Sequence, residues 1–315
     1  MTNSPLHVVF GAGQVGLALI SHLVGEGKEV RVISMHRPTL LPDGVDLRLI
    51  DAANHEAAAE AAKGAAVIYQ CLNAPYAKWP ERFPPLQRGV VAAAERTGAL
   101  LVTLENVYGY GPTDGSPMTE DLPLAATTVK GRARAEMTRE LFAASKDERI
   151  RITIGRASDF FGAGVTESTF GDHIFARALA GKKADFIGNP DFLHTYSYVP
   201  DIARGLATLG ADDRAIGQVW HLPGPETVTT RDAMEMVSTE VGFHVGIRNV
   251  PKAILSILSL FSPTMKSISE MSYEFDAPFV LDTSKYQSTF GRDVTPLKRA
   301  IADTVTWYKS HEIAF

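Results

Sequence analysis

Three glycines near the start of the chain, Gly11, Gly13 and Gly16, have the spacing of a turn that binds phosphate groups. The apolar run His7–Phe10 leads into this turn, and the helix-like segment Val15–Val24 follows it. Such a turn uses its first glycine for a tight bend, its second for close approach of a pyrophosphate, and its third for close packing of helix on strand. The positive end of the helix then faces the phosphates. A purely structural turn is the alternative, but the context favours a dinucleotide contacted by Gly11, Gly13, Gln14, Val15 and Gly16.

The end of the second apolar run bears on the choice between NAD and NADP. A site for NAD usually has Asp or Glu at this point, which binds the 2′-hydroxyl of the ribose. Here the run is followed by Met35-His36-Arg37, without an acidic residue. Since His36 and Arg37 can offer donors and positive charge to a 2′-phosphate, the sequence favours NADP(H) over NAD(H). The alternative is that Arg37 is a solvated loop residue before Pro38.

Further cofactor contacts are expected where later apolar runs end, because ligands collect at the carboxyl ends of strands in open α/β sheets. Asp51 is placed to contact the adenine edge, although it could instead cap a helix that begins near Ala53. Asn73 is placed to line the cofactor. The predicted contacts at these strand ends are Asp51, Ala52, Leu72, Asn73, Ala74, Thr103 and Ala157.

The elements that position these residues follow from the hydrophobic pattern. Over the first 155 residues, short apolar runs alternate with helix-like segments, a pattern typical of right-handed βαβ units around a parallel sheet. The expected strands are His7–Phe10, Val30–Ser34, Leu47–Ile50, Ala66–Cys71, Leu100–Leu104 and Ile150–Ile154. The expected helices are Val15–Val24, Glu56–Lys63, Leu86–Thr97 and Val129–Ala144, the last two with start signals at Pro84-Pro85 and Thr127-Thr128. The predicted fold class is α/β, a Rossmann-type doubly wound parallel sheet.

The pattern changes after Arg156, where strands and helices alternate irregularly. The expected elements are the strands Ser197–Val199 and Gln218–Leu222 and the helices Asp201–Leu209 and Arg231–Val241. The apolar segment Lys252–Phe275, broken at Pro263, is either a helical lobe packed on the sheet or a lid over an apolar substrate. We therefore expect an NAD(P)-binding domain over residues 1–156 and a small mixed substrate-binding lobe over residues 157–315, some of whose segments return to the sheet.

The composition excludes several classes of protein. With 31 Lys+Arg against 36 Asp+Glu, the net charge of −5 argues against binding to nucleic acid or to an anionic membrane surface. The single cysteine, Cys71, cannot form an internal disulfide, and the histidines lack the spacing of metal ligands, so no metal site is expected. Val250–Phe261 is too short to span a bilayer, and Met1–Pro5 lacks a leader pattern. These features predict a cytoplasmic protein whose partner is a small molecule.

Several segments together resemble the extended short-chain dehydrogenase/reductases, the NAD-dependent epimerase/dehydratase family. The resemblance is carried by Gly11–Gly16, Val107-Tyr108-Gly109, Thr119–Pro123 and Arg156–Gly162, and in the C-terminal half by Tyr198–Ala203 and Thr295–Tyr308. It covers nearly the whole chain. It implies the Rossmann fold, a nicotinamide cofactor and enzymatic activity.

The catalytic residues usual in that family are replaced in this chain. Members carry a Ser or Thr, a Tyr that exchanges a proton with the substrate oxygen, and a Lys that holds the nicotinamide ribose. Counting along the motifs places Leu104, Lys130 and Arg134 at these three positions. The resemblance then implies that Arg134 binds the ribose and that Lys130 faces the nicotinamide. A neighbouring cation and partial burial would lower the pKa of Lys130, so that it could donate a proton or polarise a carbonyl.

Other roles for these residues remain open. Tyr108 or Tyr110 could be the proton donor, and Glu105 could serve as a base. Alternatively, Lys130 and Arg134 belong to a solvated basic face, on which Arg132 pairs with Glu136.

The resemblance also places substrate contacts in the second half. Asp159 stands where the family often has Asn, in the loop that lines the nicotinamide and the substrate. His194 stands where nucleotide-sugar enzymes have an arginine for the diphosphate, and losing that bidentate donor argues against such a substrate. Asp201 is expected to cap the following helix. The predicted substrate contacts are Tyr110, Asp159, Phe160, His194 and Tyr196, whose rings indicate a fairly apolar compound.

We therefore expect an NAD(P)H-dependent oxidoreductase that acts on a small, fairly apolar carbonyl or conjugated substrate, with Lys130, Tyr108 and Arg134 as catalytic residues. The alternatives are a nucleotide-sugar epimerase or dehydratase and, because the usual triad is missing, a dinucleotide-binding redox sensor without turnover. Family members often pair through two helices, so a homodimer could form through Leu86–Thr97 and Val129–Ala144.

Overall fold

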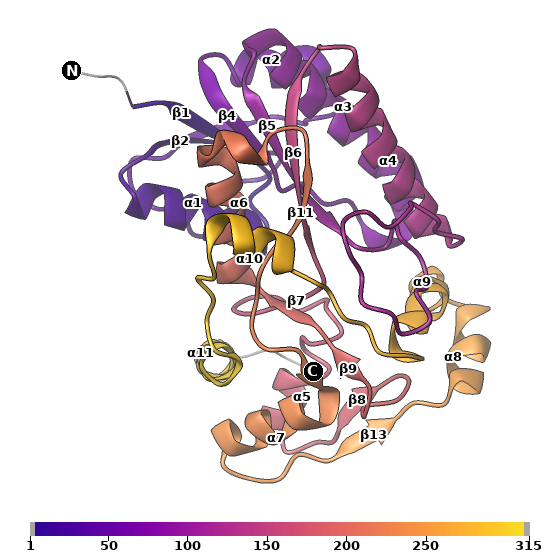
Figure 1. The fold of residues 1–315 in the computed structure, drawn as a ribbon. Coiled ribbons are helices and arrows are strands. Elements are labelled where there is room, and N and C mark those ends of the chain that lie inside the picture. The colour runs from indigo at the N-terminus through magenta and orange to yellow at the C-terminus, as the bar shows by residue number, and fades with distance from the viewer. Residues whose placement is uncertain (1–3, 312–315) are drawn as a thin grey trace.

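The computed structural model describes residues 4–311, so residues 1–3 of the segment Met1–Pro5 lie outside it. Its upper part is built on a sheet of seven strands in the order β11-β6-β5-β4-β1-β2-β3, with every neighbouring pair parallel (Figure 1). This order confirms the predicted α/β fold with a Rossmann-type, doubly wound parallel sheet. The strands are β1 Leu6–Phe10, β2 Glu29–Ser34, β3 Asp46–Leu49, β4 Ala65–Gln70, β5 Leu100–Asn106, β6 Arg151–Ala157 and β11 Val219–His221.

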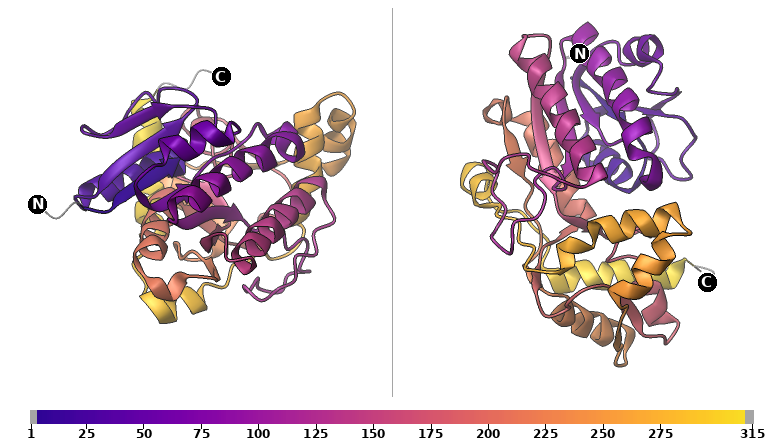
Figure 2. Two further views of the ribbon diagram at one scale, coloured as in Figure 1. Left: turned by 90° about the horizontal axis from the view of Figure 1, so that it is seen from above. Right: turned by 90° about the vertical axis from the view of Figure 1, so that its right-hand side faces the viewer.

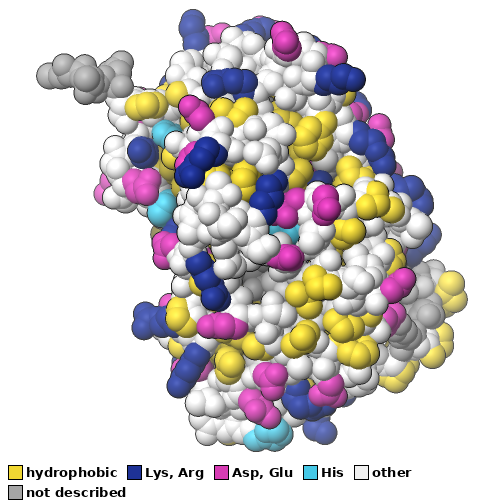
Figure 3. All heavy atoms as spheres, in the orientation of Figure 1, with side chains coloured by type: hydrophobic (Ala, Val, Ile, Leu, Met, Phe, Trp, Pro, Cys, Tyr) yellow, Lys and Arg dark blue, Asp and Glu magenta, His cyan; other side chains and the backbone are white. Residues whose placement is uncertain are grey.

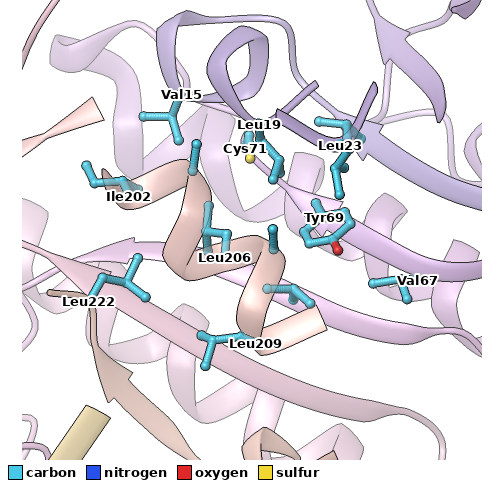
Figure 4. Packing of buried hydrophobic residues seen from close by; sticks show 14 of the residues in the cluster. Val15, Leu19, Leu23, Val67, Tyr69, Cys71, Ile202, Leu206, Leu209 and Leu222 are labelled. Carbon is cyan, nitrogen blue, oxygen red and sulfur yellow. The ribbon is translucent and has the colours of Figure 1, made fainter. Parts of the chain in front are cut away.

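Helices cover both faces of this sheet. One face carries α1 (Gln14–Gly25) and α6 (Val199–Ala211), and the other carries α2 (His55–Ala61), α3 (Trp79–Thr97) and α4 (Val129–Lys146). On the first face, leucines of α1 and α6 pack over Val67 and Tyr69 of β4 (Figure 4). Cys71 lies in the same core, and burial raises the pKa of its thiol to about 12, as expected for a packing residue.

The start of α3 differs from the prediction. The helix begins at Trp79, after the short 3₁₀ turn η1 (Tyr76–Lys78), so Pro84-Pro85 lie inside it and do not mark its start. Both prolines fall early in the helix, where each removes one hydrogen bond. The first turn is held instead by its aromatic side chains. Trp79 and Phe83 are buried, and the Trp79 indole nitrogen donates to the Ala74 carbonyl over 2.9 Å.

The smaller lobe lies beyond the carboxyl end of β6, which runs almost directly into β7 (Asp159–Phe161) (Figures 1 and 2). Its short strands form three pairs, β7 with β10 (Tyr196–Tyr198), β8 (Ala184–Phe186) with β13 (Ile247–Asn249), and β9 (Leu193–His194) with β12 (Val228–Thr229). An aromatic core joins these strands to α5 (Phe175–Leu179), α7 (Thr230–Val241) and α11 (Leu297–Ser310). The remaining elements are η2 (Asp213–Ala215), α8 (Lys252–Ser259), α9 (Pro263–Met271), η3 (Ser272–Phe275) and α10 (Ser284–Phe290).

Two aspartates considered as helix caps have other roles. Asp201 lies within the first turn of α6, whose N-cap is Tyr198, so the prediction that it caps the helix is wrong. Its buried carboxylate accepts hydrogen bonds from the Thr295 nitrogen over 3.0 Å and from the Thr295 hydroxyl over 2.7 Å, and thereby ties α6 to the segment before α11. Asn54 caps α2, whereas Asp51 accepts a hydrogen bond from the nitrogen of Ala53.

The surface carries no concentration of one charge on the face shown in Figure 3, where basic and acidic side chains are interspersed. Within residues 4–311, no helix combines the length and the apolar character needed to cross a bilayer.

The turn between β1 and α1 depends on two of its glycines. Gly11 has a φ of +97°, and a Cβ there would lie 2.6 Å from the carbonyl oxygen of Cys71. A Cβ at Gly16 would lie 2.0 Å from the carbonyl oxygen of Gly11. A Cβ at Gly13 would meet no atom within 4 Å, so the space beside this residue is open. Backbone contact fixes Gly11 and Gly16, and Gly13 leaves room for a ligand.

Gly16→Ala should therefore destabilise the protein by at least about 2 kcal/mol, because the clash is with backbone that cannot rotate away. Gly25→Ala, at the other end of α1, is the matched control. No atom lies within 4 Å of its Cβ position, and alanine favours helix, so its free energy of unfolding should stay equal or rise by up to about 1 kcal/mol. Urea denaturation compares the two variants, and equal stabilities would contradict this view of the turn.

Candidate active site

The N-terminus of α1 is built to hold an anion. Its N-cap is Gly13, without a side-chain hydrogen bond, so the first N–H groups of the helix are available to a ligand. Gly13 and Gln14 are exposed, whereas Val15 and Gly16 are buried. From the lobe, Gly164 lies against the Gln14 side chain, because a Cβ at Gly164 would be 2.5 Å from the Gln14 amide oxygen. These residues fit the pyrophosphate of a dinucleotide.

The strand order brings the other predicted cofactor contacts to the same edge of the sheet. Since β1 lies between β2 and β4 and all strands are parallel, their carboxyl ends are adjacent. His36 and Arg37 are exposed beyond β2, Asp51 is exposed beyond β3, and Asn73 is exposed beyond β4. Leu72 is half-buried, and Ala52, Ala74, Thr103 and Ala157 are buried. These four buried residues therefore present little exposed side chain to a cofactor.

Lys130 and Arg134 project from one face of α4, four residues apart, and both are buried. The helix starts at Val129, where the Thr128 hydroxyl accepts a hydrogen bond from the Gly131 nitrogen. The alternative of a solvated basic face is therefore wrong for these two residues. Nor does Arg132 pair with Glu136, because Arg132 donates to the Thr127 carbonyl and Glu136 contacts Arg139 over 3.3 Å.

Lys130 lies between an aromatic ring and a carboxylate. Its Nζ is 4.4 Å from the centre of the Tyr76 ring and 3.6 Å from Glu270 Oε2. The other oxygen of Glu270 accepts hydrogen bonds from the nitrogens of Val129 and Lys130 and so closes the start of α4. Burial lowers the pKa of Lys130, and the negative charge of Glu270 opposes this shift. Sequence reasoning missed Glu270, which comes from α9, distant along the chain.

Arg134 is a buried cation with unused donors. Its Nη2 donates to the Leu104 carbonyl over 3.2 Å, but Nε and Nη1 are buried and find no hydrogen-bond partner among residues 4–311. The guanidinium carbon lies 4.8 Å from the Phe83 ring and 5.9 Å from the Trp79 ring. Burial lowers the pKa of Arg134, while the charge of Glu105 opposes the shift. These two nitrogens without partners lie beside the end of β5 and fit the oxygens of a cofactor ribose.

Glu105 and Tyr110 belong to a buried polar network and are not free for chemistry. Glu105 accepts from Arg156 Nε over 3.0 Å and from the Thr138 hydroxyl over 2.8 Å, which argues against a role as a base. Tyr110 lies beneath Arg156, and its hydroxyl is 2.7 Å from His221 Nε2. His221 Nδ1 is 2.8 Å from the Asp282 carbonyl, so the proton on this nitrogen points to the carbonyl and Tyr110 donates to Nε2. The hydroxyl of Tyr110 is thus engaged inside the protein, although its ring shares a cluster with Phe279, on which His194 stacks.

Tyr108 lies near Lys130, because both residues contact Tyr76. Its ring is half-buried, 5.9 Å from that of Trp79, and its hydroxyl shares a hydrogen bond with that of Tyr76. Burial of the hydroxyl holds the pKa of Tyr108 well above its usual value, so this tyrosine is a proton donor only to a strong base.

The predicted substrate residues of the lobe divide into two groups. Asp159 Oδ2 lies 2.9 Å from His194 Nε2, and the His194 ring stacks on Phe275 with 5.0 Å between centres. Tyr196 instead lies in the lobe core, where its hydroxyl bonds Thr230 over 2.7 Å. Phe160 packs against the core between α1, α6 and the sheet. Asp159, with His194 as its partner, therefore lies near the titratable side chains of the site, whereas Tyr196 and Phe160 belong to the hydrophobic cores.

Glu274, in η3, is a second residue that sequence reasoning missed. Its side chain is 3% exposed, and Oε1 has no hydrogen-bond partner within the described part of the chain. Burial, with a smaller effect of Asp159, raises its pKa well above the usual value. If Glu274 were ionised, its negative charge would raise the pKa of Tyr76 and Tyr108. The sequence held no signal for it, because it sits near the end of a segment read only as an apolar helix.

The sheet order, the glycine turn and the buried cations define a Rossmann-type dinucleotide-binding protein. The sequence pattern of the NAD dependent epimerase/dehydratase family matches residues 7–222. The chain belongs to this family, whose members are NAD-dependent enzymes. No curated protein matches the sequence.

Solved structures share the fold at low sequence identity. UDP-glucuronic acid 4-epimerase from Bacillus cereus, in complex with NAD, is 16% identical with a TM-score of 0.77, over 97% of this chain and 99% of that chain. dTDP-glucose 4,6-dehydratase from Streptomyces venezuelae, with NAD and TYD bound, is 18% identical with a TM-score of 0.79, over 97% of each chain. A dTDP-glucose 4,6-dehydratase from Bacillus anthracis reaches a TM-score of 0.80 at 15% identity, over 98% of each chain.

The buried network predicts a specific dependence of stability on pH. Burial lowers the pKa of His221 from 6.5 to about 4. Between these values the unfolded chain binds more protons than the folded protein, so the free energy of unfolding falls as the pH falls. His221 alone should account for a loss of about 3 kcal/mol between pH 6.5 and pH 4.

His221→Asn should remove this part of the pH dependence, measured by urea denaturation across that range. A slope that persists in His221→Asn would show that this histidine is not buried in its neutral form.

Proposed function

We propose that this protein is an NADP(H)-dependent oxidoreductase that reduces a small, fairly apolar carbonyl or conjugated compound. The observation that carries the proposal is the burial of Lys130 and Arg134 on one face of α4, at the family's Tyr and Lys positions. A buried guanidinium with two unpartnered nitrogens, as in Arg134, is costly, and a dinucleotide phosphate–sugar chain is the ligand that the adjacent glycine turn fits.

The proposal assigns distinct parts of the cofactor to distinct residues. Gly13 and the start of α1 hold the pyrophosphate, His36 and Arg37 reach the 2′-phosphate, and Arg134 binds the nicotinamide ribose. When bound, the nicotinamide supplies or accepts a hydride. Residues 1–156 hold the cofactor in this scheme, and residues 157–315 hold the substrate, to which the lobe offers Asp159, Glu270 and Glu274.

Lys130 is assigned to the substrate oxygen. Its ammonium group can donate a proton to the oxygen or stabilise negative charge that develops there. Burial helps, since a lowered pKa makes the ammonium a better acid. Glu270 holds the side chain in place and offsets part of the desolvation. Tyr108 is the rival donor, but its raised pKa makes it the weaker acid.

A nucleotide-sugar epimerase or dehydratase is the second candidate, favoured by family membership. The site argues against it at His194, which stands at the diphosphate-binding position. This side chain is engaged by Asp159 over 2.9 Å and stacked on Phe275, so it has little freedom to bind a diphosphate. A redox sensor without turnover would bind the same cofactor, and activity alone separates it from the enzyme.

We also propose that the protein acts in the cytoplasm and that two copies pair through the outer face of α3 and α4. A hollow of about 420 Å³ lies between these helices, lined by Pro80, Pro84, Arg88, Val129, Arg132 and Met137, among others. Val129 is half exposed there, and Arg88 and Glu140 form an ion pair across the two helices over 2.9 Å.

Substituting Lys130→Met should lower kcat for NADPH-dependent reduction of an aldehyde or enone by about 100-fold, because it removes the proton donor. The Kd for NADPH, measured by fluorescence titration, should stay within about twofold, since Arg134 and the glycine turn remain. Lys146→Met, at an exposed position in the last turn of α4, is the matched control and should retain full activity. Undiminished turnover by Lys130→Met would refute this assignment.

Arg37→Ala should weaken NADPH binding by about tenfold, as expected for loss of a charge-assisted contact to the 2′-phosphate. NADH binding should not change, because NADH lacks that phosphate. Titration of both cofactors against wild type and variant measures the effect. Equal affinity of the wild type for NADPH and NADH would contradict the preference for NADP(H).

A further inference from the structure

Two glutamates of the lobe reach the site from consecutive elements, but only one has partners. Glu270, on α9, accepts hydrogen bonds from the start of α4 and contacts Lys130. Glu274, four residues later in η3, has Oε1 buried without a hydrogen-bond partner among the described residues. Figure 2 shows how this segment, in light orange, lies beside the lower end of α4. The partners of Glu270 account for its position, whereas nothing within the described residues accounts for the buried oxygen of Glu274.

An ionised carboxylate is poorly suited to the position of Glu274. The side chain is 3% exposed, so ionisation would place a charge where water cannot solvate it. The titratable groups near it come from several elements: Asp159 of β7, Tyr76 of η1, Tyr108 beyond β5, and the neighbouring Tyr273. Asp159 is itself paired with His194, and Lys130 is paired with Glu270. The negative charge of Asp159 makes ionisation of Glu274 still less favourable.

A neutral carboxylic acid has a different capacity. Its O–H donates one hydrogen bond and its carbonyl oxygen accepts others, so it matches a hydroxyl or carbonyl group of a ligand. A carboxylate or phosphate ligand would bring further negative charge next to Asp159 and Glu274. A buried polar atom left without a partner is costly, and a ligand oxygen or hydroxyl would relieve that cost.

We propose that Glu274 is a substrate-recognition residue, a neutral carboxylic acid that hydrogen-bonds an uncharged oxygen function of the substrate. The substrate is then an uncharged carbonyl compound with a second hydroxyl or carbonyl group, not a carboxylate or a phosphate ester. This inference rests on the proposed function, because the reacting carbonyl is assigned to Lys130. It makes Glu274 a determinant of specificity and leaves proton donation to Lys130.

Infrared difference spectroscopy tests the state of Glu274 without any substrate. The full-length wild type at pH 7.5 should show the carbonyl stretch of a protonated carboxylic acid, and Glu274→Gln should lack that band. Glu270→Gln is the matched control on the same segment and should keep the band, since Glu270 is the ion-pair partner of Lys130. Absence of the band from the wild type, or its persistence in Glu274→Gln, would overturn the inference.

Two aldehyde probes of similar shape test the specificity. With NADPH, the wild type should reduce 4-(hydroxymethyl)benzaldehyde with a kcat/KM at least about tenfold above that for 4-carboxybenzaldehyde, as expected from one lost hydrogen bond and an added charge. Glu274→Gln, which keeps a neutral donor and acceptor, should retain this preference. Glu274→Ala should reduce it mainly through KM for the hydroxymethyl compound. Glu235→Gln, exposed on α7, is the control for both.

The outcomes separate this inference from the proposed function. Equal or better reduction of the carboxylate probe by wild type would overturn the substrate class while leaving the oxidoreductase in place. Reduction of neither probe would count against both the proposed function and the substrate class, and the infrared band would still decide whether Glu274 is neutral.

Discussion

The guanidinium of Arg134 is enclosed by protein on most sides, yet two of its nitrogens have no partner within residues 4–311. Each buried donor left in this state costs about 1–3 kcal/mol, and more when the group is charged. The charge is offset in part by Glu105, which is itself held by Arg156 and Thr138. The arrangement is understandable if a ligand supplies the missing acceptors. The neighbouring glycine turn and the strand ends indicate that this ligand is the cofactor.

The rest of the site follows from how the fold surrounds this cation. The parallel sheet brings the ends of β1, β2 and β4 to one edge, and α4 places Lys130 one turn before Arg134. The lobe then contributes two glutamates. Glu270 orders the start of α4 and holds Lys130, and Glu274 adds a buried carboxyl group next to the tyrosines. Cations come from the sheet domain and carboxyl groups from the lobe, so the candidate chemistry lies where the two meet.

Much of this organisation could be read from the sequence. The glycine spacing and the apolar runs predicted the doubly wound parallel sheet and the phosphate turn, since both depend on local pattern and backbone geometry. The motif count placed Lys130 and Arg134 on one face of α4 because an interval of four residues is a property of any helix. Their burial was not deducible, since charged pairs of this kind lie on solvated faces as readily.

The features that could not be read depend on tertiary partners. From the sequence Asp201 is expected to cap α6. Its carboxylate instead accepts hydrogen bonds from Thr295, distant along the chain, and so connects α6 to the segment before α11. From the sequence Tyr110 is expected at the active site, but in the structure its hydroxyl hydrogen-bonds His221 within a buried network. Pro84 and Pro85 suggest a helix start, but α3 begins five residues before Pro84, at Trp79, whose side chain is buried. Glu270 and Glu274 lie in a segment whose pattern showed only amphipathic helix.

The central claim is that Arg134 and Lys130 serve a bound dinucleotide in place of the family's usual pair. A crystal structure of the protein with NADP⁺ tests it most directly. We predict that Arg134 Nε and Nη1 donate hydrogen bonds to the hydroxyls of the nicotinamide ribose, and that Lys130 Nζ faces the space where a substrate oxygen would lie beside nicotinamide C4. A complex in which the ribose binds elsewhere, with both nitrogens of Arg134 still unpartnered, would contradict the account.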